Sequence, residues 1–286
     1  ALRAVPRALN HGSVVDGFTL GAKIHEGSMA SLWEVTHPAH PGPLLMKIPG
    51  LHRGDDPAAI VSFEMEQMIL PRLSGPHVPG FVASGDFAAE PYLVMERIPG
   101  RSLRARRAEF PLPATEAAAI VARVADALHA LHRQNVVHLD VKPSNVMFRS
   151  AAGDGASRTD PASADGVGEA VMIDFGLSHH ALLPDLIEEE FRIPYGTAPY
   201  MAPEQVLGVR SDRRADLYAL GVMLYRLATG ELPFGDPQHM GAVRQRLWRD
   251  PVPPRRLRPA IPPWYQEIAL RCLEVDPERR HSTAAQ

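Results

Sequence analysis

Cysteine, lysine and long hydrophobic runs are scarce in this sequence of 286 residues. The single cysteine, Cys272, cannot form an internal disulfide, which favours a reducing compartment, and we expect a cytoplasmic location. No stretch approaches the roughly 18 unbroken apolar residues of a membrane helix, and the first residues lack the order of a signal peptide. We therefore expect no membrane contact from this segment.

Neither sign of charge dominates the chain. Thirty basic and thirty-three acidic residues leave a net charge of -3, so no overall field draws the protein to nucleic acid, which we exclude as a partner. Hydrophobic residues make up 45% of the sequence, which is enough for a folded core and too many for a disordered chain. The protein is therefore expected to be globular.

Lysine is rare among the basic residues. Only Lys23, Lys47 and Lys142 are lysine, and the other twenty-seven basic residues are arginine. A lysine that persists against this bias can mark a site that requires a compact ammonium group rather than a planar guanidinium. Lys47 and Lys142 are therefore candidate functional residues.

Two regions of different pattern divide the chain. Short apolar runs separated by Gly, His and Pro predict antiparallel strands at 18–24, 31–36, 44–48, 80–84 and 92–98. Helical spacing predicts a helix at 58–73 among the strands, and further helices at 114–133, 216–229, 239–249 and 264–274. We expect an N-terminal extension at 1–16, a lobe of five strands and one helix at 17–95, a hinge at 96–99 and a helical lobe at 100–286.

One segment of the helical lobe has the composition of a loop. Residues 150–169 are small, polar and rich in Gly and Asp, so they cannot bury enough area to offset the entropy of ordering. Apolar runs at 146–148 and 171–173 flank this segment and can pair as a hairpin. We expect a mobile surface insertion at 150–169.

Three polar residues in one short segment carry the groups that phosphoryl transfer requires. Residues 138–145 contain Asp140, Lys142 and Asn145. An Asp can accept the proton of an attacking hydroxyl, a Lys can neutralise charge on the transferring phosphoryl group, and an Asn oxygen can ligate Mg²⁺. An Asp-Phe-Gly run at 174–176 ends an apolar strand, where a hard carboxylate could hold the same metal.

A lysine and a glutamate of the first lobe are candidates for an ion pair. Lys47 lies in a predicted strand, and Glu66 lies on the helix that follows. Glu64 is the alternative partner. Glu66 is preferred because its spacing to Ile69, Leu70 and Leu73 matches the corresponding helix of the family that the sequence resembles.

From about residue 17 to residue 286 the sequence resembles a eukaryotic-type serine/threonine protein kinase, of the class also found in bacteria. The resemblance rests on motifs in one order at compatible intervals: Lys47, Glu66, the catalytic loop at 138–145, the Asp-Phe-Gly run and an Ala-Pro-Glu run at 202–204. It implies an α+β bilobal kinase fold, with a small antiparallel sheet lobe and a larger helical lobe, and ATP bound between them.

The resemblance also implies a role for each candidate residue. Those implied to act in catalysis are Asp140, Lys142, Lys47, Glu66 and Thr197, and those implied to hold Mg²⁺, with Mn²⁺ as an alternative, are Asn145 and Asp174. Those implied to contact ATP are Ile24, Gly27, Ser28, Leu32, Leu45, Lys47, Met95, Glu96, Ile98 and Met147. Asp216 is implied to anchor the catalytic loop, and Arg280 to pair with Glu204.

Three departures from the family pattern bear on activity. The glycine-rich loop that closes over the phosphates retains only its middle glycine, Gly27, and has His25 where another is usual. Leu45 replaces a small residue above the adenine ring, which narrows the pocket. Leu139 replaces the arginine with which many kinases bind a phosphorylated activation loop.

The sequence favours protein substrates modified on serine or threonine, with autophosphorylation included. Lys142 after Asp140, and Thr197 after Gly196, resemble the serine/threonine pattern, and the Ala-Pro-Glu run is usually absent from small-molecule kinases. Two alternatives remain: a pseudokinase scaffold, supported by His25, Leu45 and the lost glycines, and a small-molecule kinase. We expect a fragment of a longer chain, and the sequence names neither the physiological substrate nor the oligomeric state.

Overall fold

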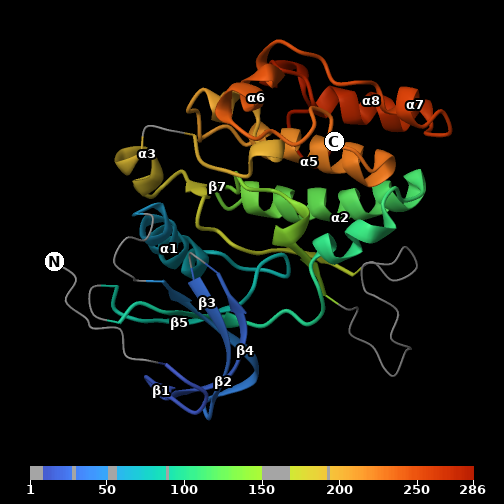
Figure 1. Ribbon diagram of the computed structural model, residues 1–286. Coiled ribbons are helices and arrows are strands. Elements are labelled where there is room, and N and C mark those ends of the chain that lie inside the picture. The colour runs from blue at the N-terminus through green and yellow to red at the C-terminus, as the bar shows by residue number, and fades with distance from the viewer. Residues whose placement is uncertain (1–8, 28–29, 51–56, 88–89, 150–167, 192–193) are drawn as a thin grey trace.

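The computed structural model describes residues 9–27, 30–50, 57–87, 90–149, 168–191 and 194–286. Figure 1 shows a lobe built on a twisted sheet, with one helix against it, beside a larger helical lobe. No helix in the described ranges has the length and apolar character needed to cross a membrane.

One antiparallel sheet forms the small lobe. Its strands follow the order β1-β2-β3-β4-β6-β5. Their bounds are β1 Val14–Val15, β2 Phe18–Glu26, β3 Ala30–His37, β4 His40–Pro49, β5 Phe81–Ser84 and β6 Leu93–Glu96. Five of these strands were expected, and the sixth is β1.

The additional strand β1 lies in the segment that we expected to be an N-terminal extension. Val14 and Val15 pair with Thr19 and Phe18 across a two-residue turn, Asp16-Gly17. Both turn residues have positive φ, 46° and 86°, as the tight hairpin turn that suits twisted strands requires. The sheet therefore begins at Val14, and the expectation of five strands was wrong.

Helix α1, Pro57–Ile69, packs against the sheet and continues into a 3₁₀ turn, η1, Leu70–Arg72. Proline suits its first position because the N–H that proline lacks has no partner there. Its buried side includes Phe63, Met65 and Ile69, which join the main hydrophobic core. The buried side also carries Glu66, which is only 1% exposed.

The large lobe is built around α5, Arg214–Thr229, which is buried along almost its whole length between α2, Ala114–His132, and α8, Pro263–Cys272. The other helices are α3 Leu186–Glu190, α4 Pro203–Val206, α6 Met240–Arg244 and α7 Pro254–Leu257. The 3₁₀ turns are η2 Leu103–Glu109, η3 Pro143–Asn145, η4 Ala198–Tyr200, η5 Gln245–Leu247 and η6 Pro277–Arg279. The short strands are β7 Val136–Val137, β8 Val146–Phe148, β9 Ala170–Met172 and β10 His179–His180.

The expected helices are present with shifted ends. The helix expected at 239–249 is shorter, because α6 ends at Arg244 and continues only as the 3₁₀ turn η5. The hairpin expected around the insertion forms between β8 and β9, and the Arg149 N–H extends it by bonding the Glu169 carbonyl at 2.9 Å. Most of the expected insertion, residues 150–167, lies outside the described residues.

Candidate active site

One buried carboxylate, that of Asp216, anchors the loop at 138–145. Asp216 of α5 accepts the backbone N–H groups of His138 and Leu139, each at 2.8 Å, and its Oδ2 also lies 2.8 Å from His132 Nε2. Asp216 is fully buried, so these bonds are shielded from water. Leu139, one of the two residues bonded in this way, has a positive φ of 62°, a strained conformation for a residue other than glycine. The anchoring expected for Asp216 is confirmed.

The Asp140 carboxylate accepts hydrogen bonds from three residues, Lys142, Thr197 and Asn145. Its Oδ2 accepts a hydrogen bond from Lys142 Nζ at 2.6 Å, and its Oδ1 accepts the Thr197 hydroxyl at 2.6 Å and the Thr197 N–H at 3.1 Å. Lys142 Nζ also donates to the Thr197 hydroxyl at 2.7 Å. The loop and the segment before η4 are therefore joined at one carboxylate, with an ammonium beside it.

Asn145 is oriented by the same carboxylate. Its amide nitrogen donates to the Asp140 carbonyl at 3.0 Å and to Asp140 Oδ2 at 3.1 Å. Because the nitrogen is engaged there, the amide oxygen is the end of the side chain that a cation could bind. Asn145 is therefore positioned as an oxygen donor.

Lys47 of β4 lies between two carboxylates. Its Nζ is 2.5 Å from Glu66 Oε2 and 3.2 Å from Asp174 Oδ1. The expected ion pair with Glu66 is present, and Glu64, the alternative partner, is absent from these contacts of Lys47. Three segments that are far apart in the sequence thus meet at one ammonium group.

The charged groups of this cluster shift one another's pKa values. Burial disfavours the charged form of Lys47, but the carboxylates of Asp174 and Glu66 outweigh it and raise the pKa of the ammonium. Lys47 in turn lowers the pKa of Asp174 against the opposing effect of burial. Both groups are therefore charged at neutral pH. The Asp174 side chain remains 46% exposed, so it is accessible to a ligand entering from solvent.

The Asp-Phe-Gly run is fixed against α1 by its second and third residues. The Phe175 N–H donates to Glu66 Oε1 at 3.2 Å, and the Phe175 ring is buried against His138, with 5.4 Å between ring centroids. A β-carbon on Gly176 would lie 2.2 Å from Ser62 Oγ and 2.9 Å from the Ser62 carbonyl oxygen, so only glycine fits this approach. Asp174 itself has a positive φ of 67°.

Most of the residues implied to contact ATP lie on strands of the small-lobe sheet or next to them. Strand register places Leu32 opposite Lys47, and Leu45 opposite Met95. Leu45 is half-buried and Met95 is buried. Ile24 is exposed near the end of β2, Gly27 follows β2, Ile98 is buried after β6, and Met147 is half-buried in β8. Of the residues implied to contact ATP, strand pairing therefore brings together Leu32 with Lys47 and Leu45 with Met95. Ser28 lies outside the described residues.

Hydrogen bonds of Glu96 with Gly80 and with Arg149 hold the segment that follows Met95. The Glu96 N–H donates to the Gly80 carbonyl at 2.7 Å, so an adenine would meet the Glu96 carbonyl rather than its N–H. The Glu96 carboxylate forms a two-bond pair with the guanidinium of Arg149, which also donates to the carbonyls of Pro76 and Val78. This pair lowers the pKa of Glu96 through its hydrogen bonds, against the effect of burial. Sequence reasoning missed Arg149, because nothing local indicates its distant partner.

Two buried polar residues fix the segment that carries the Ala-Pro-Glu run. Arg280 binds both oxygens of Glu204, at 2.6 and 2.8 Å, which confirms the expected pair. Gln205 was not anticipated. Its Nε2 donates to the Leu139 carbonyl at 2.8 Å, and its Oε1 accepts the Ala202 N–H at 2.9 Å, so it joins this segment to the loop that carries Asp140.

Comparison with known proteins agrees with this geometry. Residues 18–286 match the protein-family profile described as Protein kinase domain. Serine/threonine-protein kinase PknB of Mycobacterium leprae is 30% identical over 236 residues, which are 81% of this chain and 35% of that protein. Serine/threonine-protein kinase Pkn1 of Myxococcus xanthus is 30% identical over 270 residues, which are 94% of this chain and 37% of that protein. The chain thus spans little more than a third of the length of these relatives.

A solved structure has the same architecture. The crystal structure of a point mutant of the PknI kinase domain from Mycobacterium tuberculosis superposes with a TM-score of 0.67 at 25% identity. The match covers 98% of this chain and 96% of that domain. The expected bilobal arrangement of an antiparallel sheet lobe and a helical lobe is confirmed.

Proposed function

The chain belongs to the protein kinase family, and on that premise we propose that it transfers the γ-phosphoryl group of ATP to serine and threonine hydroxyls of proteins, its own included. The observation that carries the proposal is the contact of Lys47 with both Glu66 and Asp174. Phosphoryl transfer depends mainly on positioning and on charge stabilisation, and this cluster supplies a fixed cation beside a metal-binding carboxylate.

We assign the hydroxyl-orienting role to Asp140. Its carboxylate accepts bonds from Lys142 and Thr197, which fix its direction. A substrate hydroxyl that approaches this carboxylate would donate its proton to Asp140 as its oxygen bonds to the γ-phosphorus, while the bond from that phosphorus to the bridging oxygen breaks and ADP leaves. Lys142, beside it, would stabilise the negative charge on the transferring group.

The residues present suit a magnesium ion. Mg²⁺ is usually held by one or two protein carboxylates together with substrate phosphates and water, rather than by an all-protein cage. Asp174 and the Asn145 amide oxygen would supply the protein ligands, and the metal would neutralise phosphate charge. The described residues contain no cluster of three or more His, Cys, Asp or Glu side chains that could hold a metal, which is consistent with a site shared with nucleotide. Mn²⁺, which takes similar oxygen ligands, is the alternative.

The nucleotide would lie between the sheet and β8. Lys47, braced by Glu66, would bind the α- and β-phosphates, while the adenine would lie between Leu45 and Met147, next to Met95. The Glu96 carbonyl and the backbone of Ile98 would bind the edge of the base. Ile24, Gly27, Ser28 and Leu32 would cover the nucleotide from the β2–β3 side.

Two other functions compete with this proposal. A pseudokinase scaffold would keep the fold without turnover. His25, Leu45 and the lost glycines are its support, but the intact Lys47 cluster argues against it. A small-molecule kinase is disfavoured by the segment from Thr197 to Glu204, which is anchored by Arg280 and suits a protein substrate.

One experiment separates the three functions. The purified protein is incubated with γ-labelled ATP, Mg²⁺ and a generic protein substrate, and the label is followed. Label on serine and threonine of protein supports the proposal. Label on a metabolite supplied from a cell extract supports the small-molecule kinase, and nucleotide binding without any transfer supports the pseudokinase.

A further inference from the structure

A cavity of about 440 Å³ opens beside the proposed catalytic loop. Lys142 and Thr197, both bonded to Asp140, line it on one side. A polypeptide that brings a hydroxyl to Asp140 would therefore lie beside this cavity. Its other walls come from η2, from α5 and from the loop that follows α5.

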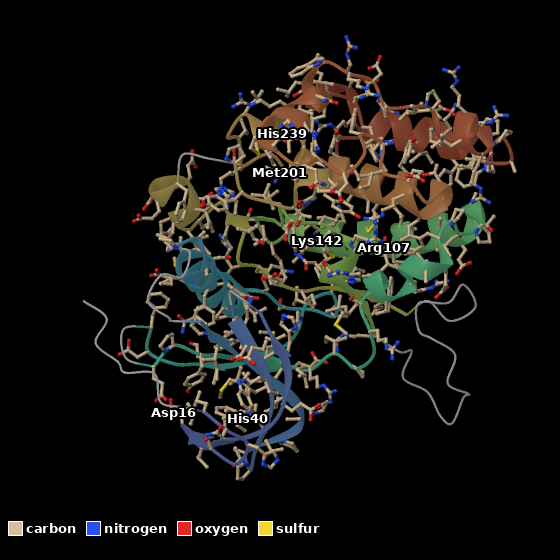
Figure 2. The ribbon with its side chains drawn as sticks, in the orientation of Figure 1. Asp16, His40, Arg107, Lys142, Met201 and His239 are labelled. Carbon is tan, nitrogen blue, oxygen red and sulfur yellow. The ribbon has the colours of Figure 1, made fainter. Side chains whose placement is uncertain are left out.

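Three arginines gather in this cavity. Arg104 and Arg107 come from η2, and Arg226 comes from α5. Residues three apart in a 3₁₀ helix lie on the same face, so Arg104 and Arg107 project to one side of η2. Figure 2 shows Arg107 near Lys142 in the large lobe, and both line the cavity.

The two arginines of η2 have free binding capacity. Neither the Arg104 nor the Arg107 guanidinium has a hydrogen bond or ion pair to any residue that the structure describes, and both side chains are exposed. Their neighbour Arg106 differs, because it turns inward to the carboxylates of Glu109 and Glu116, at 2.6 and 2.7 Å. The helix thus neutralises one arginine internally and presents the other two to the cavity.

The balance of charge in the cavity is positive. Arg226 donates to the Tyr200 hydroxyl at 2.8 Å, which is a neutral partner, so its charge is not cancelled by that bond. Lys142 is already paired with Asp140, so the three arginines of the lining stand against two carboxylates, Glu231 and Asp236, on the loop after α5. The excess of cations is concentrated on the side formed by η2 and α5.

We propose that this cavity binds an anionic side chain of the substrate, close in sequence to the serine or threonine that is modified. The planar guanidinium matches carboxylate and phosphate oxygens in two-bond geometry, so an Asp, a Glu or a phosphorylated residue fits the site. The same charges disfavour a basic side chain by repulsion. This inference rests on the proposed function, which it extends to a class of substrate: acidic segments of proteins.

Separate measurements of peptide binding and of peptide turnover test this inference. Fluorescein-labelled peptides carry an alanine in place of the acceptor, flanked by Glu, Ala, Lys or phosphoserine, and their affinity is measured by anisotropy. The same four sequences with serine restored are used for kcat/KM with ATP and Mg²⁺. The variants are R104E/R107E and the milder R104Q/R107Q, and R101E is the matched control because Arg101 is exposed and lies outside the cavity lining.

For the wild-type protein and for R101E, we expect the Glu peptides to exceed the Ala peptides about tenfold in affinity and in kcat/KM, and the Lys peptides to fall below them. Charge reversal should invert this order, and R104Q/R107Q should remove the preference. The preference should also fade toward 1 M salt, where the Debye length is about 3 Å. If only the phosphoserine peptide gains, the anion is a phosphate rather than a carboxylate.

Equal behaviour of acidic, neutral and basic peptides, or a preference that survives R104E/R107E, overturns the inference and leaves the proposed function intact. Selective binding of acidic peptides without turnover of any of them supports the cavity's role and contradicts the proposed function instead.

Discussion

The Lys47 ammonium lies 2.5 Å from the Glu66 carboxylate and joins β4 to helix α1. The same carboxylate accepts the Phe175 N–H, so the pair also determines where the Asp-Phe-Gly run lies relative to the sheet. This contact connects the sheet, the helix and the metal-binding run in one arrangement. Its loss should therefore affect catalysis and stability together.

Replacing Lys47 by Met should lower kcat/KM for phosphoryl transfer by at least about 100-fold, because a preorganised charge at the phosphates is lost. The protein should still fold, with its free energy of unfolding lowered by up to about 3 kcal/mol, since Glu66 is left buried without its partner. Urea unfolding and steady-state kinetics measure the two effects. Lys23→Met is the matched control, because Lys23 lies near the surface, where it pairs with Glu26 and lies 4.9 Å from the centroid of the Trp33 ring. Near wild-type turnover in Lys47→Met would refute the assigned role.

Replacing Leu45 by Ala should tighten ATP binding by about 1–2 kcal/mol, or roughly tenfold in Kd. Leu45 lies opposite the buried Met95 on the sheet, so the two side chains would crowd the same part of the proposed adenine site. Calorimetric titration with ATP and Mg²⁺ checks this, with Leu207→Ala, at a 71% exposed site, as the control. Weaker binding by Leu45→Ala would mean that the side chain contacts the base favourably instead.

Stability should fall in acid partly through Asp185, whose pKa is lowered to about 2. Burial alone would raise this pKa, but hydrogen bonds from His179 and Arg210 and the backbone bond from Glu188 outweigh it. Because the folded pKa lies below the unfolded value of about 3.9, the stabilisation is complete above that value and is lost as pH falls toward 2; it amounts to about 2–3 kcal/mol.

Asp185→Asn can still cap α3, so it isolates the charge. We expect the variant to be less stable than the wild type at pH 6, and the difference to shrink as pH is lowered toward 3, both measured by urea unfolding. A difference that stays constant across this range would contradict the assignment.

The segment between Gly176 and Thr197 should need no phosphorylation for activity. Its hydroxyl residues are Ser178 and Tyr195. Ser178 is fully buried and donates to the His138 carbonyl at 3.1 Å, so it is inaccessible to a second kinase molecule. The Thr197 hydroxyl is already engaged with Asp140 and Lys142. Phosphatase-treated protein should retain its turnover; loss of activity, with phosphate mapped to Ser178 or Thr197, would show the reverse.

Most of what could be predicted from the sequence depended on the spacing of residues that are close together along the chain. The residues of the loop at 138–145 are near one another along the chain, so their convergence followed from their order. The strand β1 was missed, although Asp16-Gly17 is a strong hairpin signal, because the two-residue strand before this turn is too short to show alternation.

Contacts between distant segments could not be read in this way. Arg149 and Glu96 are 53 residues apart. Arg226 of α5 and Arg107 of η2 line one cavity only because tertiary packing brings these two elements together there. In a chain with twenty-seven arginines, composition does not distinguish these three from arginines on the solvated surface. Their partners depend on tertiary packing, which motif spacing does not describe.

The central claim is that Asp140 directs transfer of the γ-phosphoryl group to serine and threonine residues of proteins. The most direct test compares wild-type protein with Asp140→Asn in γ-labelled ATP, Mg²⁺ and a generic protein substrate, followed by phosphoamino acid analysis. We predict label on phosphoserine and phosphothreonine for the wild type, and a rate lower by at least about 100-fold for the variant, because the group that accepts the hydroxyl proton is lost. Equal rates for the two proteins, or no labelled protein with wild type, would contradict the claim.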